Sequence, residues 1–276
     1  MVSSGYNFTF LMKTITIDGV SLQRYIELLH VLVERNLKAR YRGSFLGVYW
    51  SLLNPLIMTG LYTAIFGANF AEYYNNSTVS YILAAFTGLV VINFYSASTS
   101  QALSSIVGNG GLLNKIKLPV SIFPVSMIVA NIWQFFVGVL PILAITTLLT
   151  SQSLINLSGL FFILIALGLV CSGVGFFVGT LYVFFRDLPY FYELVCFVVW
   201  ISSPVFYPAE IVPEQVKPFL LLNPLTSIIE SLRQISLSGE PPSLLILSRA
   251  ILTGLISLGL GWSFFQWQKD NFMDLI

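Results

Sequence analysis

The chain has 276 residues, of which 56% are hydrophobic and only 9% are charged, whereas soluble domains carry about 25% charged residues. This composition excludes an ordinary soluble enzyme and predicts an all-α integral membrane protein, since helices satisfy their own backbone hydrogen bonds in lipid. The net charge of +1 gives no support for binding nucleic acid, which requires a basic face. We expect a single membrane domain with about six spans.

The N-terminal residues 1–43 are expected to remain outside the bilayer. Residues 1–19 are polar and lack the features of a cleavable signal peptide. In residues 21–42, apolar residues recur every three or four positions and charges fill the other side, which predicts an amphipathic helix along the membrane surface. Glu34 and Lys38 should pair across one helical turn. A plain solvated helix and a helix that docks a partner both remain open.

The first span is expected in residues 43–71, which contain no charged residue. A polar loop at residues 72–80 separates it from a second span at residues 81–106. Glycines and then Lys115 and Lys117 follow the second span, and they predict a basic elbow on the cytoplasmic side.

The remaining spans follow from the same reasoning. Residues 118–185 lack charge and are too long for one helix, so the polar patch 150–158 should divide them into the third and fourth spans. The fifth span is expected at residues 194–209 and the sixth at residues 244–268, with re-entrant or interfacial helices in residues 210–243 between them.

The distribution of lysine and arginine predicts the orientation. These residues precede the first span, follow the second and fourth spans, and occur in the tail at residues 269–276, whereas the loops 72–80 and 150–158 contain none. Both termini should therefore face the cytoplasm, and the bundle of residues 44–268 should cross the membrane between them.

The sequence carries no recognisable catalytic or metal site. It lacks the phosphate-binding GxxxxGK[ST] loop, so this chain should not hydrolyse ATP by itself. His30 has no second histidine at metal-binding spacing, and Cys171 and Cys196 fall in apolar stretches that predict packed thiols. Ionisable residues lie only near the ends of the predicted spans, as at Glu193 and Arg249, which argues against an ion-coupled carrier.

Several strings of residues have a familiar order and spacing. They are RYRGSFLGVYWSLLNPL at residues 40–56, NGGLLNKIKLP at 109–119, FRD at 185–187, SPVFYP at 203–208, and NPL at 223–225 with Arg233. Together they resemble type-2 ABC export permeases of the O-antigen, capsule and teichoic-acid group over nearly the whole chain.

The resemblance implies a permease of the bacterial cytoplasmic membrane that dimerises and exports a lipid-linked glycan. It also implies a separate ABC subunit that binds ATP and Mg, so this chain would need no cofactor of its own. The amphipathic helix and the elbow would contact that subunit, although their basic residues would also be needed for orientation alone. The implied contact residues are Glu34, Arg35, Lys38, Arg40, Asn114, Lys115 and Lys117.

A conduit for sugars should combine aromatic rings, which stack on the apolar face of a sugar, with hydroxyl and amide groups. The first and fifth spans contain such mixtures, although packing and interface roles are the alternative. Arg40 and Arg42 could bind the phosphate of the lipid carrier as bidentate donors, or could serve only in orientation and in contact with anionic lipid. The candidate path residues are Tyr49, Trp50, Asn54, Tyr62, Trp200, Ser203, Phe206 and Tyr207.

Two other functions are consistent with such a sequence. A type-2 ABC permease for a smaller lipid or a drug would have similar spans, and its cargo would distinguish it. A channel or secondary carrier that needs no nucleotide belongs to a different class, and copurification with an ATP-binding protein would exclude it.

Overall fold

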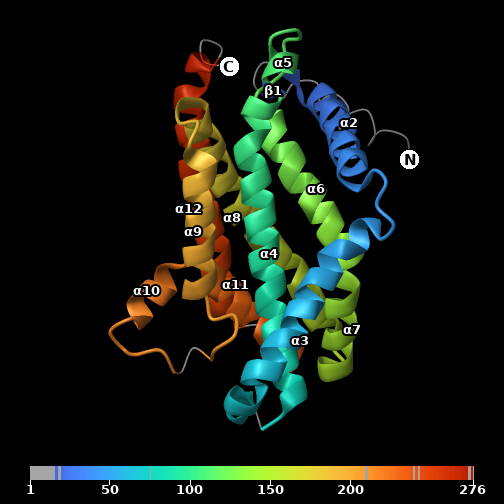
Figure 1. Ribbon diagram of the computed structural model, residues 1–276, viewed down its shortest axis with the longest axis vertical. Coiled ribbons are helices and arrows are strands. Elements are labelled where there is room, and N and C mark those ends of the chain that lie inside the picture. Colours follow the sequence, from blue (N-terminus) through green and yellow to red (C-terminus); the bar gives the residue numbers. More distant parts are fainter. Residues whose placement is uncertain are drawn as a thin grey trace, which may run out of the picture.

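The computed structural model describes residues 16–17, 20–74, 76–208, 211–238, 240–241, 243–272 and 275. Within these residues the regular secondary structure is helical apart from a short antiparallel pair, β1 (Thr16–Ile17) and β2 (Val20–Ser21). Figure 1 shows an elongated bundle whose long helices run along one axis. The all-α prediction is therefore correct, whereas much of the expected segment 1–19 lies outside the described residues.

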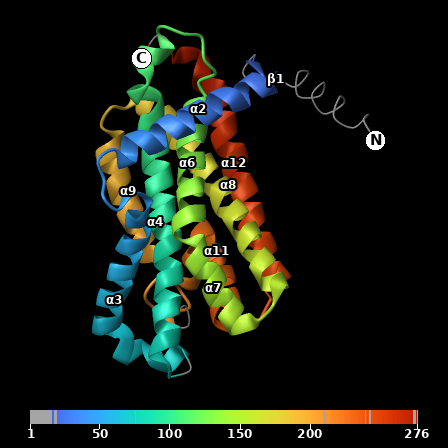
Figure 2. The ribbon, with the colours of Figure 1, turned by 90° about the vertical axis from the view of Figure 1, so that its right-hand side faces the viewer.

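The amphipathic helix is α2 (Leu22–Tyr41), and it lies obliquely across one end of the bundle (Figure 2). Its buried residues are Tyr25, Leu32 and Asn36, whose spacing places them on one face. The expected ion pair is present, with 2.5 Å between Lys38 Nζ and Glu34 Oε1.

In the described part of the chain, four helical segments are long and apolar enough to cross a membrane, and a bent pair of helices makes a fifth when it is taken as one span. The four are built on α3 (Trp50–Phe70), α4 (Thr78–Gly108), α8 (Leu154–Phe184) and α12 (Leu244–Gln268). The short 3-10 turns η1 (Gly47–Tyr49), η2 (Ala71–Tyr74) and η5 (Lys269–Asn271) extend α3 and α12.

The expected third span is broken into α6 (Ile122–Gly138) and α7 (Leu140–Ser151), which are bent by 48°. This bend was not predicted from the sequence. Pro141 lies in the first turn of α7, and because it has no backbone N–H it cannot continue the hydrogen-bond ladder of α6. The turn expected within residues 150–158 is present and short, since α8 begins at Leu154.

The expected fifth span also needs correction, because α9 covers Leu188–Ser202 rather than residues 194–209. Pro189 lies in its first turn, where its fixed φ favours a helix start. Glu193 is therefore inside α9 and is exposed. With 15 residues, α9 is shorter than the four long spans.

Short helices follow α9, in the segment expected to be re-entrant or interfacial. They are α10 (Lys217–Leu222), α11 (Pro224–Arg233) and the π-helical turn η4 (Gln234–Ser238). Figure 1 shows α10 projecting from the side of the bundle at the end opposite the elbow.

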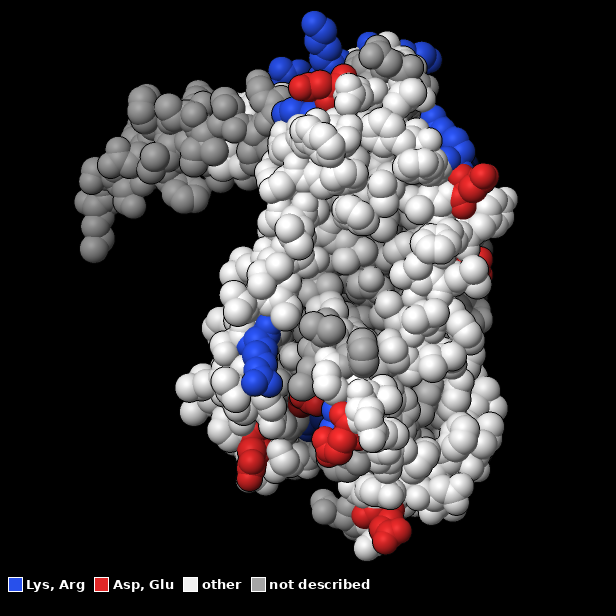
Figure 3. All heavy atoms as spheres, turned by 90° about the vertical axis from the view of Figure 1, so that its left-hand side faces the viewer, with Lys and Arg blue, Asp and Glu red and all other residues white. Residues whose placement is uncertain are grey.

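The first and the last described residues lie at the same end of the molecule as the elbow. The elbow helix α5 (Gly110–Leu113) lies near β1 and the end of α12 in Figure 1. Arg186, in the turn between α8 and α9, donates a hydrogen bond of 2.8 Å to the carbonyl oxygen of Leu275. On the face in Figure 3, the middle of the molecule is predominantly uncharged, as a membrane-embedded surface requires.

Glycines allow the central helices to approach closely. A Cβ atom at Gly173 in α8 would lie 2.2 Å from the backbone of Ser257 in α12, and one at Gly175 would lie 2.8 Å from Ala102 in α4. A Cβ atom at Gly179 would lie 3.1 Å from the carbonyl oxygen of the same Ala102. Gly175 and Gly179 thus form a contact within one chain.

Candidate functional site

A cleft of about 510 Å³ opens between α3, α4, α6 and the end of α2. Two predicted path residues of α3, Trp50 and Asn54, line this cleft, whereas Tyr49 does not and is 60% exposed. The predicted phosphate ligand Arg40 also lies on its wall. The structure therefore brings part of the predicted path and one of the two arginines together.

Arg40 is held by three amide side chains. Its guanidinium donates to Gln101 Oε1, to Gln134 Oε1, and to Asn131 Oδ1 at 3.0 Å. Asn131 also donates to Gln101 at 2.9 Å. These contacts fix the guanidinium between α4 and α6 without neutralising its charge, because amides are uncharged.

Arg42 has a different location. It is exposed and lies with Glu34, Arg35 and Lys38 along a shallow groove on α2, outside the cleft that contains Arg40. The structure thus separates the two arginines, which the sequence presents as an equivalent pair.

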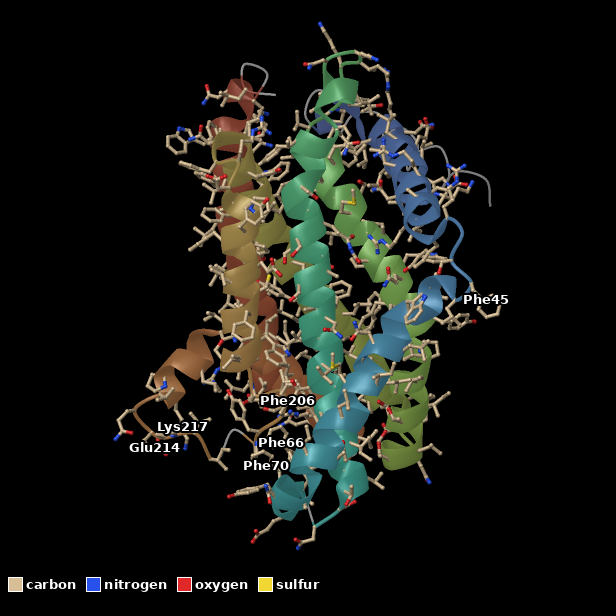
Figure 4. The ribbon with its side chains drawn as sticks, viewed as in Figure 1. Phe45, Phe66, Phe70, Phe206, Glu214 and Lys217 are labelled. Carbon is tan, nitrogen blue, oxygen red and sulfur yellow. The ribbon has the colours of Figure 1, made fainter. Side chains whose placement is uncertain are left out.

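The remaining predicted path residues meet in a second pocket of about 380 Å³, between the lower part of α3 and the end of α9. Tyr62 stacks on Phe206 with 3.6 Å between the ring centroids, and Trp200 meets Phe206 edge-on at 5.5 Å. In Figure 4, Phe66 and Phe70 of α3 lie beside Phe206 at this end of the molecule. The pocket is lined by Tyr62, Phe66, Phe70, Trp200, Ile201, Ser203, Phe206, Tyr207 and Ile211.

The segment after α9 is anchored by an arginine and an asparagine. Arg233 of α11 donates to the carbonyl oxygens of Ala84 at 3.1 Å and Val205 at 2.8 Å. Asn223 donates to Ser203 Oγ at 2.9 Å, and its own oxygen accepts from the backbone of Leu225 at the start of α11. Two of the strings that carry the family resemblance, SPVFYP and NPL, therefore meet in space.

The predicted contacts for a second subunit lie at the end that contains the elbow. Asn114, Lys115 and Lys117 are exposed just beyond α5. Arg35 donates to Asn109 Oδ1 at 2.8 Å and so ties α2 to the start of the elbow. Since the Lys38 ammonium lies against Glu34, it lowers the pKa of that exposed carboxyl.

The polar residues of α4 at the cleft were not predicted from the sequence. Asn93 and Ser96 line the cleft, and Gln101 holds Arg40. Their spacing of three to five residues places them on one helical face, and this periodicity within an apolar span would have identified them.

Nothing in the described part of the chain resembles a metal centre, since no three His, Cys, Asp or Glu residues lie close enough to share an ion. Both cysteines are unpaired thiols, with Cys171 buried. The cleft and the aromatic pocket present hydrogen-bonding groups, rings and one cation, a set suited to binding a polar ligand.

Comparisons with known proteins place this chain among transport proteins. It is 29% identical over 252 residues to the O-antigen export system permease protein RfbA of Klebsiella pneumoniae, with 91% of this chain and 95% of the relative covered. It is 27% identical to the protein of the same name from Myxococcus xanthus, with 92% and 97% covered. The polysialic acid transport protein KpsM of Escherichia coli is 21% identical, with 86% and 91% covered.

The family model described as "ABC-2 type transporter" matches residues 27–237. This match includes most of α2, both pockets and the anchored segment after α9. The chain therefore belongs to the ABC-2 type transporter family.

Proposed function

We propose that this chain is the membrane-spanning permease of an ATP-driven exporter of lipid-linked polysaccharide, of the O-antigen, capsule or teichoic-acid type. The observation that carries the proposal is its end-to-end similarity to relatives named as O-antigen export permeases, since 91% of this chain and 95% of the relative align. The amide and hydroxyl side chains beside Arg40 in the cleft, among them Asn54, Asn93 and Asn131, support a cargo that bears hydroxyl groups and a phosphate.

The energy source in this proposal is a separate ABC subunit that binds ATP and Mg. It would dock at the end of the molecule where α2 and the elbow meet, and two copies of the permease would form the working unit. The hydrogen bond between Arg35 and Asn109 supports this site, because it couples α2 to the elbow. A movement of the ATP-binding subunit would therefore displace both elements together. The proposed contacts are Glu34, Arg35, Lys38, Asn114, Lys115 and Lys117. Arg40, which the sequence also suggested, is turned into the cleft and is left out of this set.

We place the protein in the bacterial cytoplasmic membrane with both termini in the cytoplasm and about six crossings. The broken pair α6–α7 and the short helix α9 would complete the crossings made by the four long segments. The grouping of the elbow, the Arg186 turn and the C-terminal residues at one end supports this orientation, because lysine and arginine favour the cytoplasmic side.

The cargo would meet Arg40 first and the aromatic pocket later. Arg40 lies toward the proposed cytoplasmic end and has the donors to bind a phosphate, whereas the rings of Tyr62, Trp200 and Phe206 offer faces on which sugars stack. Arg42 is the alternative phosphate contact, from the outer groove of α2.

The proposal is tested by deleting the gene in its native host and restoring it from a plasmid. We expect the deletion to strand undecaprenyl-linked glycan in the cytoplasm and to remove surface polysaccharide, and the plasmid to reverse both. Normal surface polysaccharide in the deletion strain would contradict the proposal. Loss of a small lipid from the outer leaflet, with the glycan unaffected, would favour a permease for a smaller cargo.

A further inference from the structure

A row of uncharged polar side chains runs along one face of α4. It consists of Asn93, Ser96, Ser100, Gln101 and Ser104, and we call it the α4 polar face. The intervals between these residues are those of neighbouring turns on one side of a helix. The row extends from the middle of α4 toward the elbow end.

This face is accessible, whereas the opposite face of α4 is packed. Ser100 and Ser104 are exposed, and the other three members are half-buried. On the opposite side, Ala102 and Ile106 are 0% exposed. In Figure 1, α4 lies between α9 on one side and α2 and α6 on the other.

Such a face is unsuited to contact with lipid. Polar groups without partners in hydrocarbon are costly, so polar residues inside membrane segments face the bundle interior or a water-filled cavity. The middle of α12 shows the contrast, since its exposed side chains there, such as Leu252, Leu255 and Leu260, are 52–69% exposed and apolar.

Some groups of the α4 polar face have protein partners, since Ser104 donates to the carbonyl oxygen of Gln101 and the Cys196 thiol lies against Ser96 and Ser100. The remaining hydrogen-bonding capacity of its exposed hydroxyls and of Asn93 is best met by water or a polar ligand opposite the face.

The α4 polar face is continuous with the cleft. Asn93 and Ser96 line the cleft, and Gln101 accepts a hydrogen bond from Arg40 at its edge. Among the described residues, no Asp or Glu lines this cleft, so the charge of Arg40 is not neutralised there. The chemistry of the combined surface is one cation beside a row of amides and hydroxyls.

We propose that the α4 polar face is the water-lined wall along which the sugar chain travels, an inference that rests on the proposed function. Hydroxyls and amides exchange hydrogen bonds with sugar hydroxyls about as readily as water does, so each contact is weak. A row of weak, similar sites allows a long chain to enter and still move on, as conduction requires. A helix outside the predicted path thus becomes one of its walls.

The first test measures water along α4 by cysteine labelling. Cys171 and Cys196 are replaced by alanine, and single cysteines are introduced by S96C, S100C and S104C in membranes that also contain the ATP-binding subunit. L255C and L260C on α12 are the lipid-facing controls. We expect a charged methanethiosulfonate reagent to modify the three α4 positions at least several-fold faster, because it reacts with thiolates, which form only in water.

Labelling of the α4 positions as slow as that of the α12 controls would overturn the inference. The result does not depend on the cargo, so it is separable from the proposed function. If the deletion strain strands glycan but the α4 positions fail to label, only the α4 wall is wrong. If they label and no glycan is stranded, the water-lined face remains and the assigned cargo is wrong.

The second test addresses the sugar. S100L and S104L replace a hydroxyl by an apolar group on an exposed position, where the fold has room for it, and S100T retains the hydroxyl. We expect S100L and S104L to lower surface polysaccharide and strand glycan at unchanged protein level, and S100T to export normally. Normal export by both leucine variants would exclude this face from the sugar path.

Discussion

At the scale of single residues, the structure separates two arginines that are neighbours in the sequence. Arg40 is fixed by Gln101, Asn131 and Gln134 at the cleft, whereas Arg42 is exposed on the outer side of α2. From the sequence, both arginines are candidate phosphate ligands, because each guanidinium can donate two hydrogen bonds to a phosphate. The sequence could not separate them, because the chain leaves its helical path at Arg42, the C-cap of α2.

We therefore expect R40Q to abolish most polysaccharide export while R42Q retains it. The variant R40Q keeps a polar side chain but removes the cation from the cleft. Surface polysaccharide is measured beside the amount of permease in the membrane and its melting temperature, so that loss of folding is recognised. Equal export by the two variants would show that the Arg40 charge does not act on the cargo.

Arg233 is expected to act in stability. Its guanidinium satisfies the carbonyl oxygens of Ala84 and Val205, and hydrogen bonds to a charged group contribute about 1.5–3 kcal/mol. R233A should therefore lower the melting temperature of the purified protein clearly. The matched control is K217A, which removes only an exposed pair with Glu214 at 2.6 Å (Figure 4). Similar melting of R233A and the unmodified protein would contradict this role.

The pair of Glu34 and Lys38 should give a small and pH-dependent contribution. Its geometry lowers the pKa of Glu34, so its stabilisation is present above the ordinary glutamate pKa of about 4.3 and is lost as the pH falls through the lowered value. E34Q should thus melt slightly below the unmodified protein at pH 7 and together with it at pH 3. Because both groups are exposed, salt should reduce the difference at pH 7. A larger difference at pH 3 than at pH 7 would be inconsistent with this sign.

At the scale of elements, the long helices were predictable, but their breaks and contacts were not. Uninterrupted apolar runs identified α3, α4, α8 and α12. The break before α7 was missed because its residues are as apolar as those around them, and only Pro141 marks it. The start of α9 at Leu188 was not predicted for a related reason. The continuous apolar run begins only at residue 194, whereas the signal that starts the helix is Pro189 in its first turn.

The contact between α8 and α12 depends on glycine at specific positions. A Cβ at Gly173 would meet the backbone of Ser257 at 2.2 Å, whereas one at Gly259 would meet nothing within 4 Å. We expect G173A to destabilise the protein by more than the ~1–3 kcal/mol typical of overpacking, because the obstacle is backbone. G259A should be neutral or stabilising, since alanine favours a helix by about 0.5–1 kcal/mol.

Thermal unfolding of the two variants in the same detergent would measure this difference. Both variants add one methyl group to a glycine of the same helix pair, so their intrinsic effects on the helices are alike. If G173A and G259A melted together, the close approach of α8 and α12 would be refuted.

At the scale of the whole molecule, the end containing α2 and the elbow is the proposed docking site for the ATP-binding subunit. Lys115 and Lys117 are exposed there and are suited to charge-assisted contacts. We expect the double variant K115Q/K117Q to copurify with less of that subunit, whereas K217Q, at α10 on the opposite end, should copurify normally. The retention of the subunit is measured at low and physiological salt.

Undiminished copurification of K115Q/K117Q would exclude the elbow lysines from the interface. The amount of the K115Q/K117Q permease in the membrane fraction is measured as well, so that a failure of the variant to insert is distinguished from a loss of binding. This control matters because basic residues at this end are also expected to set the orientation.

The way in which α2 is attached has a mechanical consequence. Besides apolar packing, the part of α2 up to Asn36 contacts the bundle through single side-chain hydrogen bonds, such as Asn36 to Ser126 at 3.1 Å and Tyr25 to Ser121 at 3.3 Å, each contributing about 1 kcal/mol. The C-terminal end of α2 is held more firmly, because Arg40 donates to three amide side chains. At the glycine contact, the backbones of α8 and α12 pack directly against each other at Gly173 and Ser257, and no space is left between them. The part of α2 up to Asn36 can therefore shift by exchanging one hydrogen bond at a time while Arg40 holds its C-terminal end, and the rigid α8–α12 pair serves as the fixed frame against which the helix tilts.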